Sequence, residues 1–179
     1  MLKENEMTKG IVLPDKNSRL ERKFFSRRSD VVAQDLLGRV LVHERNNAAN
    51  IYLLIKEVAS YEGQIKSTSK GMLCAPGTIG ISAKYGQRIL DIATGEVAEP
   101  SCVTLIGGEV YDGRGFRESV NGPGKLTSSL NIDRSYDGLM IDLDISPVWI
   151  CGERIDEELI GQRNKSNAPE NCLGYFYLR

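Results

Sequence analysis

The chain has 179 residues, of which 41% are hydrophobic and 26% are charged. This length corresponds to one domain, and the apolar fraction suffices for a core, which excludes a disordered or collagen-like chain. Lys and Arg number 23 against 24 Asp and Glu, so the formal net charge is -1. That balance excludes a strongly basic nucleic-acid coat, although it leaves room for a local basic face.

The N-terminal sequence MLKENEMTKG lacks the apolar region of a signal peptide, and no run approaches 18 consecutive apolar residues. We therefore expect an intracellular protein, cytoplasmic, nucleoid-associated or nuclear, that is neither secreted nor bound to a membrane. Four widely spaced cysteines without a Cys-x-x-Cys pair, and a single histidine, make a zinc site and a disulfide scaffold improbable. We expect a monomer without a metal or other cofactor.

The first element predicted in chain order is a helix. Residues 1–18 are polar and aperiodic and predict a flexible tail, followed by one domain over residues 19–179. The run SDVVAQDLLG then predicts a helix that Ser29 or Asp30 caps and Gly38 ends. The side chains expected on its apolar face are Val32, Leu36 and Leu37.

Strands dominate the rest of the chain. RVLVH predicts a strand ending at His43, which we expect to be structural, and ERNNAAN predicts a hairpin into IYLLIKEV. KLTSSLNI predicts a short helix after a GPG turn. Strands outnumber helices without regular alternation, which indicates an α+β domain with an antiparallel sheet. Further strands are expected at TIGISA, SCVTLI, LMIDLD, PVWIC and GYFYL, and turns at APGT, GGEVYDGRG and NGPGK.

Six segments in order resemble motifs of one family. These are FF followed by DVVAQDLLGRVLV, then IKEVASYEG, GMLCAPGTIGISAKYG, PSCVTLIGGE, NGPGKLTSSLNIDRSYDG and LGYFYLR. Over roughly residues 20–179 they are similar to the 3-methyladenine DNA glycosylases of the alkyladenine glycosylase type, and NGPGKL is the most specific match. The resemblance implies a curved antiparallel β-sheet core with flanking helices. It also implies binding of double-stranded DNA from the minor-groove side, flipping of an alkylated purine, and hydrolysis of its N-glycosidic bond without a metal.

The resemblance assigns DNA contacts to four positions. Tyr85 stands at the family's aromatic wedge, Gln87 and Arg88 at its groove contacts, and Lys125 at its phosphate-binding lysine. The residues by themselves also allow a tyrosine packed at a strand end, a solvated arginine and an ordinary turn lysine. A basic cluster near the start of the domain is compatible with phosphate affinity or with a solvated helix entry; it comprises Arg22, Lys23, Arg27 and Arg28.

The catalytic pattern departs from the family. Aligning Glu57 and Tyr61 with the family's E-x-E-A-Y puts Ala59 at its general base. A methyl group cannot take a proton, and such general-base work is worth about 10²- to 10⁴-fold in rate. Glu57 shares a strand face with Ala59 at about 7 Å, and Asp91 falls at a family asparagine if one gap follows Arg88. Each is a candidate substitute base or a structural carboxylate.

Other base-pocket positions change as well. Tyr61 is retained, either to stack on the flipped base or to hold its strand. Without the family's pocket tyrosines, an electron-poor alkylated purine loses a stacking platform. Gly80 and Ser82 stand at those two tyrosines, Ile106 at a pocket arginine and Lys70 at a pocket histidine.

Three functions remain open at this point. The first is an active glycosylase of base-excision repair in which Glu57 or Asp91 replaces the missing base. The second is a catalytically inactive relative that senses distorted DNA through Tyr85 and Lys125. The third is a fold that now serves another ligand or a protein partner.

Overall fold

The computed structural model of the protein describes residues 15–63, 74–84, 86–96 and 100–179. Its strands are β1 (Val40–His43), β2 (Ile51–Glu62), β3 (Ile79–Lys84), β4 (Gln87–Ala93), β5 (Ser101–Asp112), β6 (Gly115–Asn121), β7 (Val148–Cys151), β8 (Ile160–Arg163) and β9 (Cys172–Leu178). Its helices are α1 (Arg22–Phe25), α2 (Ser29–Leu36) and α3 (Pro123–Ser129), with 3-10 helices η1 (Lys16–Ser18), η3 (Arg134–Tyr136) and η4 (Glu157–Leu159). Within these residues, no helix has the length and apolarity needed to cross a membrane.

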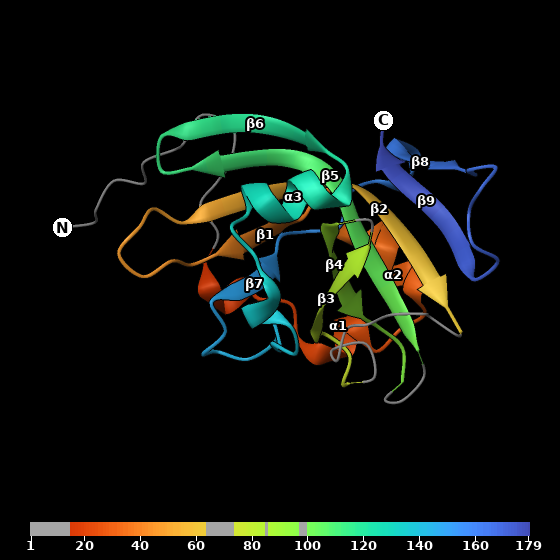
Figure 1. The fold of residues 1–179 in the computed structure, drawn as a ribbon, viewed down its shortest axis with the longest axis horizontal. Helices are drawn as coiled ribbons and strands as arrows, with labels where there is room; N and C mark the ends of the chain where they lie inside the picture. The colour runs from red at the N-terminus through yellow and green to blue at the C-terminus, as the bar shows by residue number, and fades with distance from the viewer. Residues whose placement is uncertain (1–14, 64–73, 85, 97–99) are drawn as a thin grey trace.

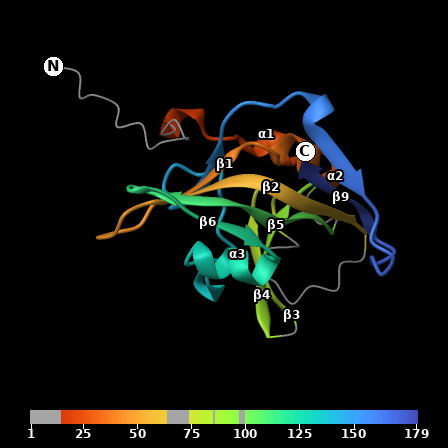
Figure 2. The ribbon, with the colours of Figure 1, turned by 90° about the horizontal axis from the view of Figure 1, so that it is seen from above.

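The strands form a curled, antiparallel sheet (Figures 1 and 2). Its main path runs β3-β4-β5-β2-β1-β7, while β6 pairs with β5, and β9 pairs with both β2 and β8. The long strands β2 and β5 lie at its centre, so β2 has neighbours from the middle and from the end of the chain. The predicted α+β class with a curved antiparallel sheet is confirmed.

The main core lies between one face of this sheet and the helices. Helix α2 packs on β2, β5 and β9, and α3 packs on β4, β5 and β6. Val32 and Leu36 of α2 and Leu126 of α3 are fully buried, and each such side chain contributes roughly 1.5–3 kcal/mol by leaving water. These contacts fix both helices on the sheet.

The ends of α2 follow the prediction only in part. Gly38 adopts φ +78°, and a Cβ there would lie 2.4 Å from Cγ2 of Ile155, so glycine is required after the helix. Ser29 is the first helical residue and does not cap the helix with its own side chain. Its N–H donates to Oε1 of Glu62 at 3.3 Å, so a carboxylate from β2 takes that role.

One predicted strand is absent. LMIDLD forms turns, and within the described residues its ladder contact is the single bridge between Thr78 and Met140. The alternating pattern was misleading because Leu143 is exposed instead of sharing a buried face with Ile141, and the Asp142 side chain is only 9% exposed. The aspartates form ion pairs, Asp142 with Arg22 at 2.9 Å and Asp144 with Arg19 at 3.0 Å.

Three strands, β4, β6 and β8, were not predicted. The segment GGEVYDGRG was interpreted as a turn, but β5 continues through its first six residues and turns only before Gly115. Gly107 and Gly108 lie inside β5, at a point where the backbones of the neighbouring strands leave no room for a side chain. A Cβ on Gly108 would lie 2.2 Å from the carbonyl oxygen of Leu54 on β2.

A β-bulge divides β2 into two halves. The register with β5 shifts on both sides of Glu57, which pairs with Gly107. Before the bulge, odd-numbered residues such as Ile55 face the main core, and after it Val58 does. An extra residue absorbed in this way reverses the alternation. Glu57, Ala59 and Tyr61 therefore share the face opposite the main core.

The N-terminal segment packs onto the sheet from residue 15 onwards. Residues 16–18, assigned to the tail in the sequence prediction, form η1, whose first turn is closed by the side chain of Asp15. The ammonium of Lys16 pairs with Glu44 at 2.8 Å. This ion pair joins η1 to the residue that follows β1.

Candidate active site

A row of four side chains crosses the sheet at Ala59. Ala59 on β2 lies directly opposite Thr104 on β5 and Tyr175 on β9, and Thr104 lies opposite Asp91 on β4. Directly opposed residues of antiparallel strands project to the same face. Flanking residues of all four strands belong to the main core, which fixes the row on the other face; they are Val58, Leu90, Ile92, Val103, Leu105 and Phe176.

Ala59 lies in a small apolar cluster. Its side chain is completely buried, and it packs with Ile106 and Tyr175. Tyr61 borders the same cluster, and its hydroxyl lies 3.4 Å from that of Tyr175. Burial and the neighbouring Tyr175 hydroxyl raise the pKa of Tyr61 above its usual value. The cluster supplies aromatic and apolar contacts at the position where the family resemblance places a general base.

Glu57 shares this face but is engaged by a cation. The guanidinium of Arg163 on β8 donates to its carboxylate, and the Glu57 side chain is 13% exposed. The same guanidinium lies 5.6 Å from the centre of the Tyr177 ring. The ion pair with Arg163 therefore occupies the Glu57 carboxylate.

Asp91 is the more unusual carboxylate. It is 6% exposed, and its oxygens accept hydrogen bonds from the hydroxyls of Thr104 and Ser82. Burial raises its pKa to about 6, although the two hydroxyl donors oppose the shift. Among the residues that the structure describes, no ion pair to Asp91 is found. A buried carboxylate with neutral partners and a perturbed pKa is typical of functional sites.

The structure thus brings most predicted site residues onto one face. Ser82 contacts Asp91, while Ile106 and Tyr61 border Ala59. Sequence reasoning missed Thr104 and Tyr175. The alternation in SCVTLI and GYFYL could have placed both on a common face, but their register with Ala59 depends on strand pairings that no local pattern reveals.

The predicted DNA contacts Gln87, Arg88 and Lys125 lie near one another. A Cβ on Gly124 would lie 2.7 Å from Oε1 of Gln87, so the start of α3 packs directly against the start of β4 (Figure 2). The hydroxyl of Thr127 donates to the carbonyl of Arg88 at 2.9 Å and ties the two elements together. Lys125 pairs with Glu118 at 3.5 Å and remains 56% exposed. Tyr85 and Lys70 lie outside the described residues.

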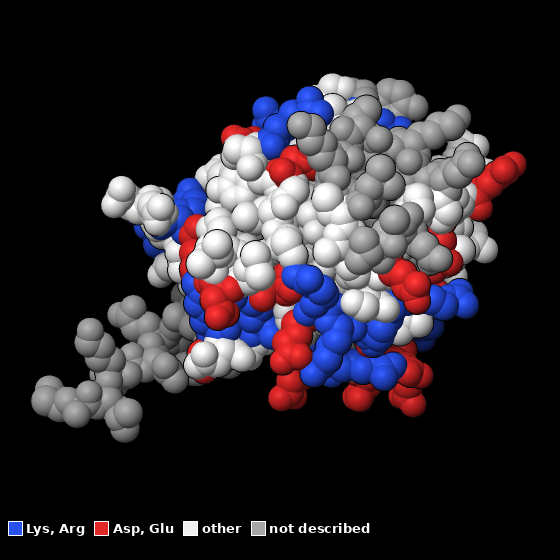
Figure 3. Space-filling view, turned by 90° about the horizontal axis from the view of Figure 1, so that it is seen from below, with Lys and Arg blue, Asp and Glu red and all other residues white. Residues whose placement is uncertain are grey.

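The basic cluster of Arg22, Lys23, Arg27 and Arg28 is paired with carboxylates. Its contacts are Arg22 with Asp142 at 2.9 Å, Lys23 with Glu21 at 2.8 Å, Arg27 with Asp35 at 2.7 Å and Arg28 with Asp30 at 3.1 Å. Figure 3 shows basic and acidic side chains intermixed on the face seen from below. These contacts favour the interpretation as a solvated helix entry.

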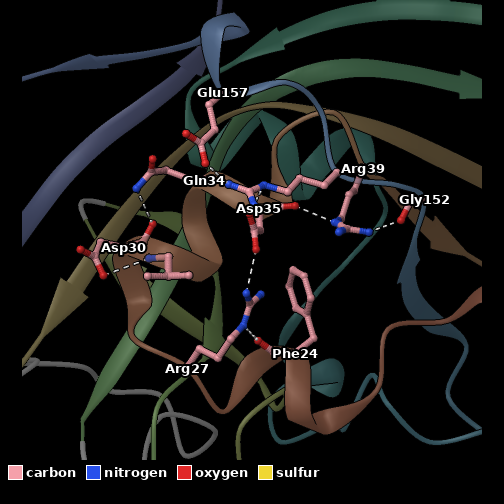
Figure 4. Close-up of polar contacts among 10 residues, drawn as sticks. Phe24, Arg27, Asp30, Gln34, Asp35, Arg39, Gly152 and Glu157 are labelled. Atoms are coloured by element: carbon pink, nitrogen blue, oxygen red, sulfur yellow. Dashed lines mark hydrogen bonds and ion pairs between the residues drawn. The ribbon is translucent and has the colours of Figure 1, made fainter.

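Arg27 belongs to a structural network around α2 (Figure 4). Asp35 also pairs with Arg154 at 3.0 Å, and its carbonyl accepts from Nε of Arg39 at 2.6 Å. The ring of Phe24 lies 4.4 Å from the guanidinium of Arg27 and 4.9 Å from that of Arg39. The network joins α1 and α2 to the segment after β7.

His43 is structural, as predicted. Its Nδ1 lies 2.8 Å from the carbonyl of Leu130, and its Nε2 lies 2.8 Å from the Tyr136 hydroxyl. Burial lowers its pKa. The ring therefore links β1 to the segment after α3.

Comparison with known proteins identifies the class of this fold and site as a DNA glycosylase. A sequence model of the methylpurine-DNA glycosylase (MPG) family matches residues 23–167. A protein of Streptomyces avermitilis is 31% identical over 150 residues, covering 72% of this chain and 70% of that protein. A protein of Desulfitobacterium hafniense is 32% identical over 164 residues, covering 75% and 80%. One of Clostridium novyi is 26% identical over 195 residues, covering 90% and 95%.

Each of these three relatives carries the name "Putative 3-methyladenine DNA glycosylase". The chain belongs to the methylpurine-DNA glycosylase family, whose members act in base-excision repair of alkylated purines. Membership implies a DNA substrate.

Proposed function

We propose that the protein flips an alkylated purine out of duplex DNA and hydrolyses its N-glycosidic bond, with Asp91 rather than Glu57 as the carboxylate that acts on the reacting centre. The supporting observation is the row across the sheet, in which Asp91 faces the same side as Ala59 and accepts hydrogen bonds from two hydroxyls, with Lys84 as a nearby cation. Glu57 lies nearer along the strand but is neutralised by Arg163.

The distance between Asp91 and Ala59 determines which role Asp91 can have in the reaction. Neighbouring strands are about 4.8 Å apart, so two strand spacings separate the Cα atoms of Asp91 and Ala59 by about 10 Å. A general base must approach its water to about 3 Å, which Asp91 does not do at the position of Ala59. A charge still acts over such a distance, with about 1.7 kcal/mol at 10 Å and an effective dielectric constant of 20. Asp91 would therefore stabilise developing positive charge rather than prime the water.

The DNA would be bound from the minor-groove side by a monomer. Gln87, Arg88 and Lys125 adjoin at the starts of β4 and α3, and Tyr85 would be the wedge that fills the gap left by the flipped base. This substrate would place the protein in the cytoplasm, nucleoid or nucleus.

Single-turnover base release from a duplex containing 3-methyladenine tests the proposal. We expect release above the spontaneous rate and a loss of at least about tenfold in Asp91→Asn, as removal of an electrostatic contribution of this size requires. Glu57→Gln should keep most of the rate. The opposite ranking of the two variants would show that Glu57 carries the chemistry.

A second candidate is a catalytically inactive lesion binder. The observation that favours it is the complete burial of Ala59 beneath Tyr175 and beside Tyr61. This function predicts affinity for lesion-containing duplex that falls with salt, without base release. Selective binding of the lesion-containing duplex, together with base release no faster than the spontaneous rate in buffer, would support the inactive lesion binder.

A further inference from the structure

We infer that the protein has a second activity, cleavage of the DNA strand at an abasic site, in which the ε-amine of Lys165 attacks C1′ of the deoxyribose. An abasic deoxyribose is what remains in the strand after base release, so the inference rests on the proposed function for the place at which the sugar lies. It adds one reaction to that function, because hydrolysis of the N-glycosidic bond alone leaves the strand intact.

The loop between β8 and β9, residues 164–171, places Lys165 on the substrate face. Its Nζ lies 4.3 Å from the centre of the Tyr175 ring, and Tyr175 lies directly opposite Ala59. Ala168 of the same loop packs against the apolar cluster that contains Ala59. Lys165 itself is exposed, so a DNA sugar at this face can reach its amine.

Backbone contacts fix this loop on the sheet. The N–H of Ala168 donates to the carbonyl of Lys165 at 3.0 Å, which closes a turn inside the loop. The N–H of Glu62, at the end of β2, donates to the carbonyl of Asn171 at 3.0 Å. At the other end, the guanidinium of Arg163 pairs with a carboxylate of β2. The loop therefore stays near the substrate face, while the flexible lysine stem lets the amine move.

The other described lysines suit this role less well. Four of them pair with carboxylates, namely Lys16, Lys23, Lys56 and Lys125. Lys84 lies on β3, which β4 and β5 separate from the strand of Ala59. Lys165 contacts an aromatic ring, and no carboxylate in the described part of the chain forms an ion pair with it. An exposed contact between a cation and a ring is weak, so the amine can leave the ring when a sugar approaches.

The missing general base also favours an amine as the nucleophile. Ala59 cannot take a proton from water, so water attacks C1′ at this face without assistance. A neutral amine needs no further deprotonation before it attacks, and lysine amines form Schiff bases with carbonyl carbons. An abasic deoxyribose offers such a carbon, because its ring opens to an aldehyde at C1′.

The reaction balances without an oxidant or a reductant. The Lys165 amine, after giving its extra proton to the solvent, adds to the C1′ aldehyde, and water leaves as the C1′–N imine forms. The protonated imine withdraws electrons, so the solvent removes a proton from C2′. The electron pair of that C–H bond forms the C2′–C3′ double bond, while the C3′–O bond breaks and the 3′-phosphate leaves with its pair. Water then hydrolyses the imine and returns the free amine.

A duplex with one abasic site, prepared by enzymatic removal of uracil, tests the inference without requiring base release by the protein. Sodium borohydride reduces the imine and should link the protein covalently to the DNA, and without borohydride the strand should be cut. Lys165→Arg keeps the positive charge but forms no stable imine, so it should lower both signals at least about tenfold. Lys23→Arg, the same substitution at an exposed lysine beside α1, is the matched control and should leave both unchanged.

Two further measurements separate chemistry from binding and from base release. Lys165→Arg should bind the abasic duplex as the parent protein does, whereas equal losses of binding and of trapping would make Lys165 a DNA contact and overturn the inference. Peptide mapping should find the DNA on Lys165, and its attachment to another lysine, or no trapping at all, would also overturn it. Base release from a 3-methyladenine duplex without trapping would leave the proposed hydrolysis intact, and trapping without release would support the second activity alone.

Discussion

Asp91 illustrates at the scale of one residue how a buried carboxylate opposes folding. Burial raises the pKa of its carboxyl to about 6 from an ordinary value of 3.8, although two hydroxyl donors and the charge of Lys84 oppose the shift. The folded state therefore binds more protons than the unfolded state between these values, and stability decreases as pH rises through this window. Above pH 6 the whole penalty of the buried charge is present.

Replacement of Asp91 by Asn should remove this penalty. We expect the variant to be more stable than the parent protein at pH 8, by at most about 3 kcal/mol, because the pKa difference sets that limit. Near pH 4 the parent carboxyl is protonated and the advantage should largely disappear. Urea denaturation at both pH values checks this expectation, and a variant that is equally destabilised at both would contradict it.

Gly38 shows a different kind of dependence on a single residue. Gly38→Ala should destabilise the protein by about 1–2 kcal/mol from its positive φ alone, and by more from the contact with Ile155 at 2.4 Å. Gly63→Ala is the control, because Gly63 has φ +80° and an added Cβ would have no atom of the described residues within 4 Å. Thermal or urea unfolding should rank Gly38→Ala as the more destabilised variant, and equal losses would exclude a role for Ile155.

At the scale of elements, local patterns predicted β1, α2, α3, β7 and β9 well because each combines apolar periodicity with a clear stop signal. They failed at LMIDLD, where the alternation imitates a strand although Ile141 is buried and Leu143 is exposed. They failed again at Gly108, whose glycine serves a close backbone approach inside β5. The bulge at Glu57 is equally invisible to a local pattern, because it depends on how β2 pairs with β5.

The contact between α3 and β4 should be sensitive to one hydroxyl. Thr127→Val keeps the shape of the buried side chain but removes the hydrogen bond to the carbonyl of Arg88. We expect a loss of about 1–2 kcal/mol and faster amide exchange in β4. Ser128→Ala is the control, because its exposed hydroxyl bonds only within α3, to the carbonyl of Gly124. Similar effects of the two substitutions would show that the link to β4 contributes nothing.

At the scale of the whole molecule, a net charge of -1 gives no overall attraction to DNA, so any DNA affinity must come from local contacts. The sequence identified Arg88 and Lys125 through the family resemblance, but it could not separate them from the basic cluster near α1. Only the folded chain shows that all four members of this cluster pair with carboxylates at 2.7–3.1 Å. Lys125 lies 3.5 Å from Glu118, and Arg88 forms no ion pair with the residues that the structure describes.

The salt dependence of DNA binding should report this difference. Arg88→Ala and Lys125→Ala should each weaken duplex binding and lower the slope of log affinity against log salt by about 1, as loss of one phosphate contact does. Lys23→Ala, which removes an exposed cation paired with Glu21, should leave the slope unchanged. A larger effect of Lys23→Ala than of the other two would place the DNA on the α1 side instead.

The pairing of β2 with both β5 and β9 has a consequence for synthesis on the ribosome. The half of β2 that carries Ala59 receives its second neighbour only when residues 172–178 have been made. Until then, the backbone N–H and C=O groups on this side of the strand are unpaired and can form hydrogen bonds with other nascent chains. Completion of the substrate face is thus among the last events in the maturation of this polypeptide.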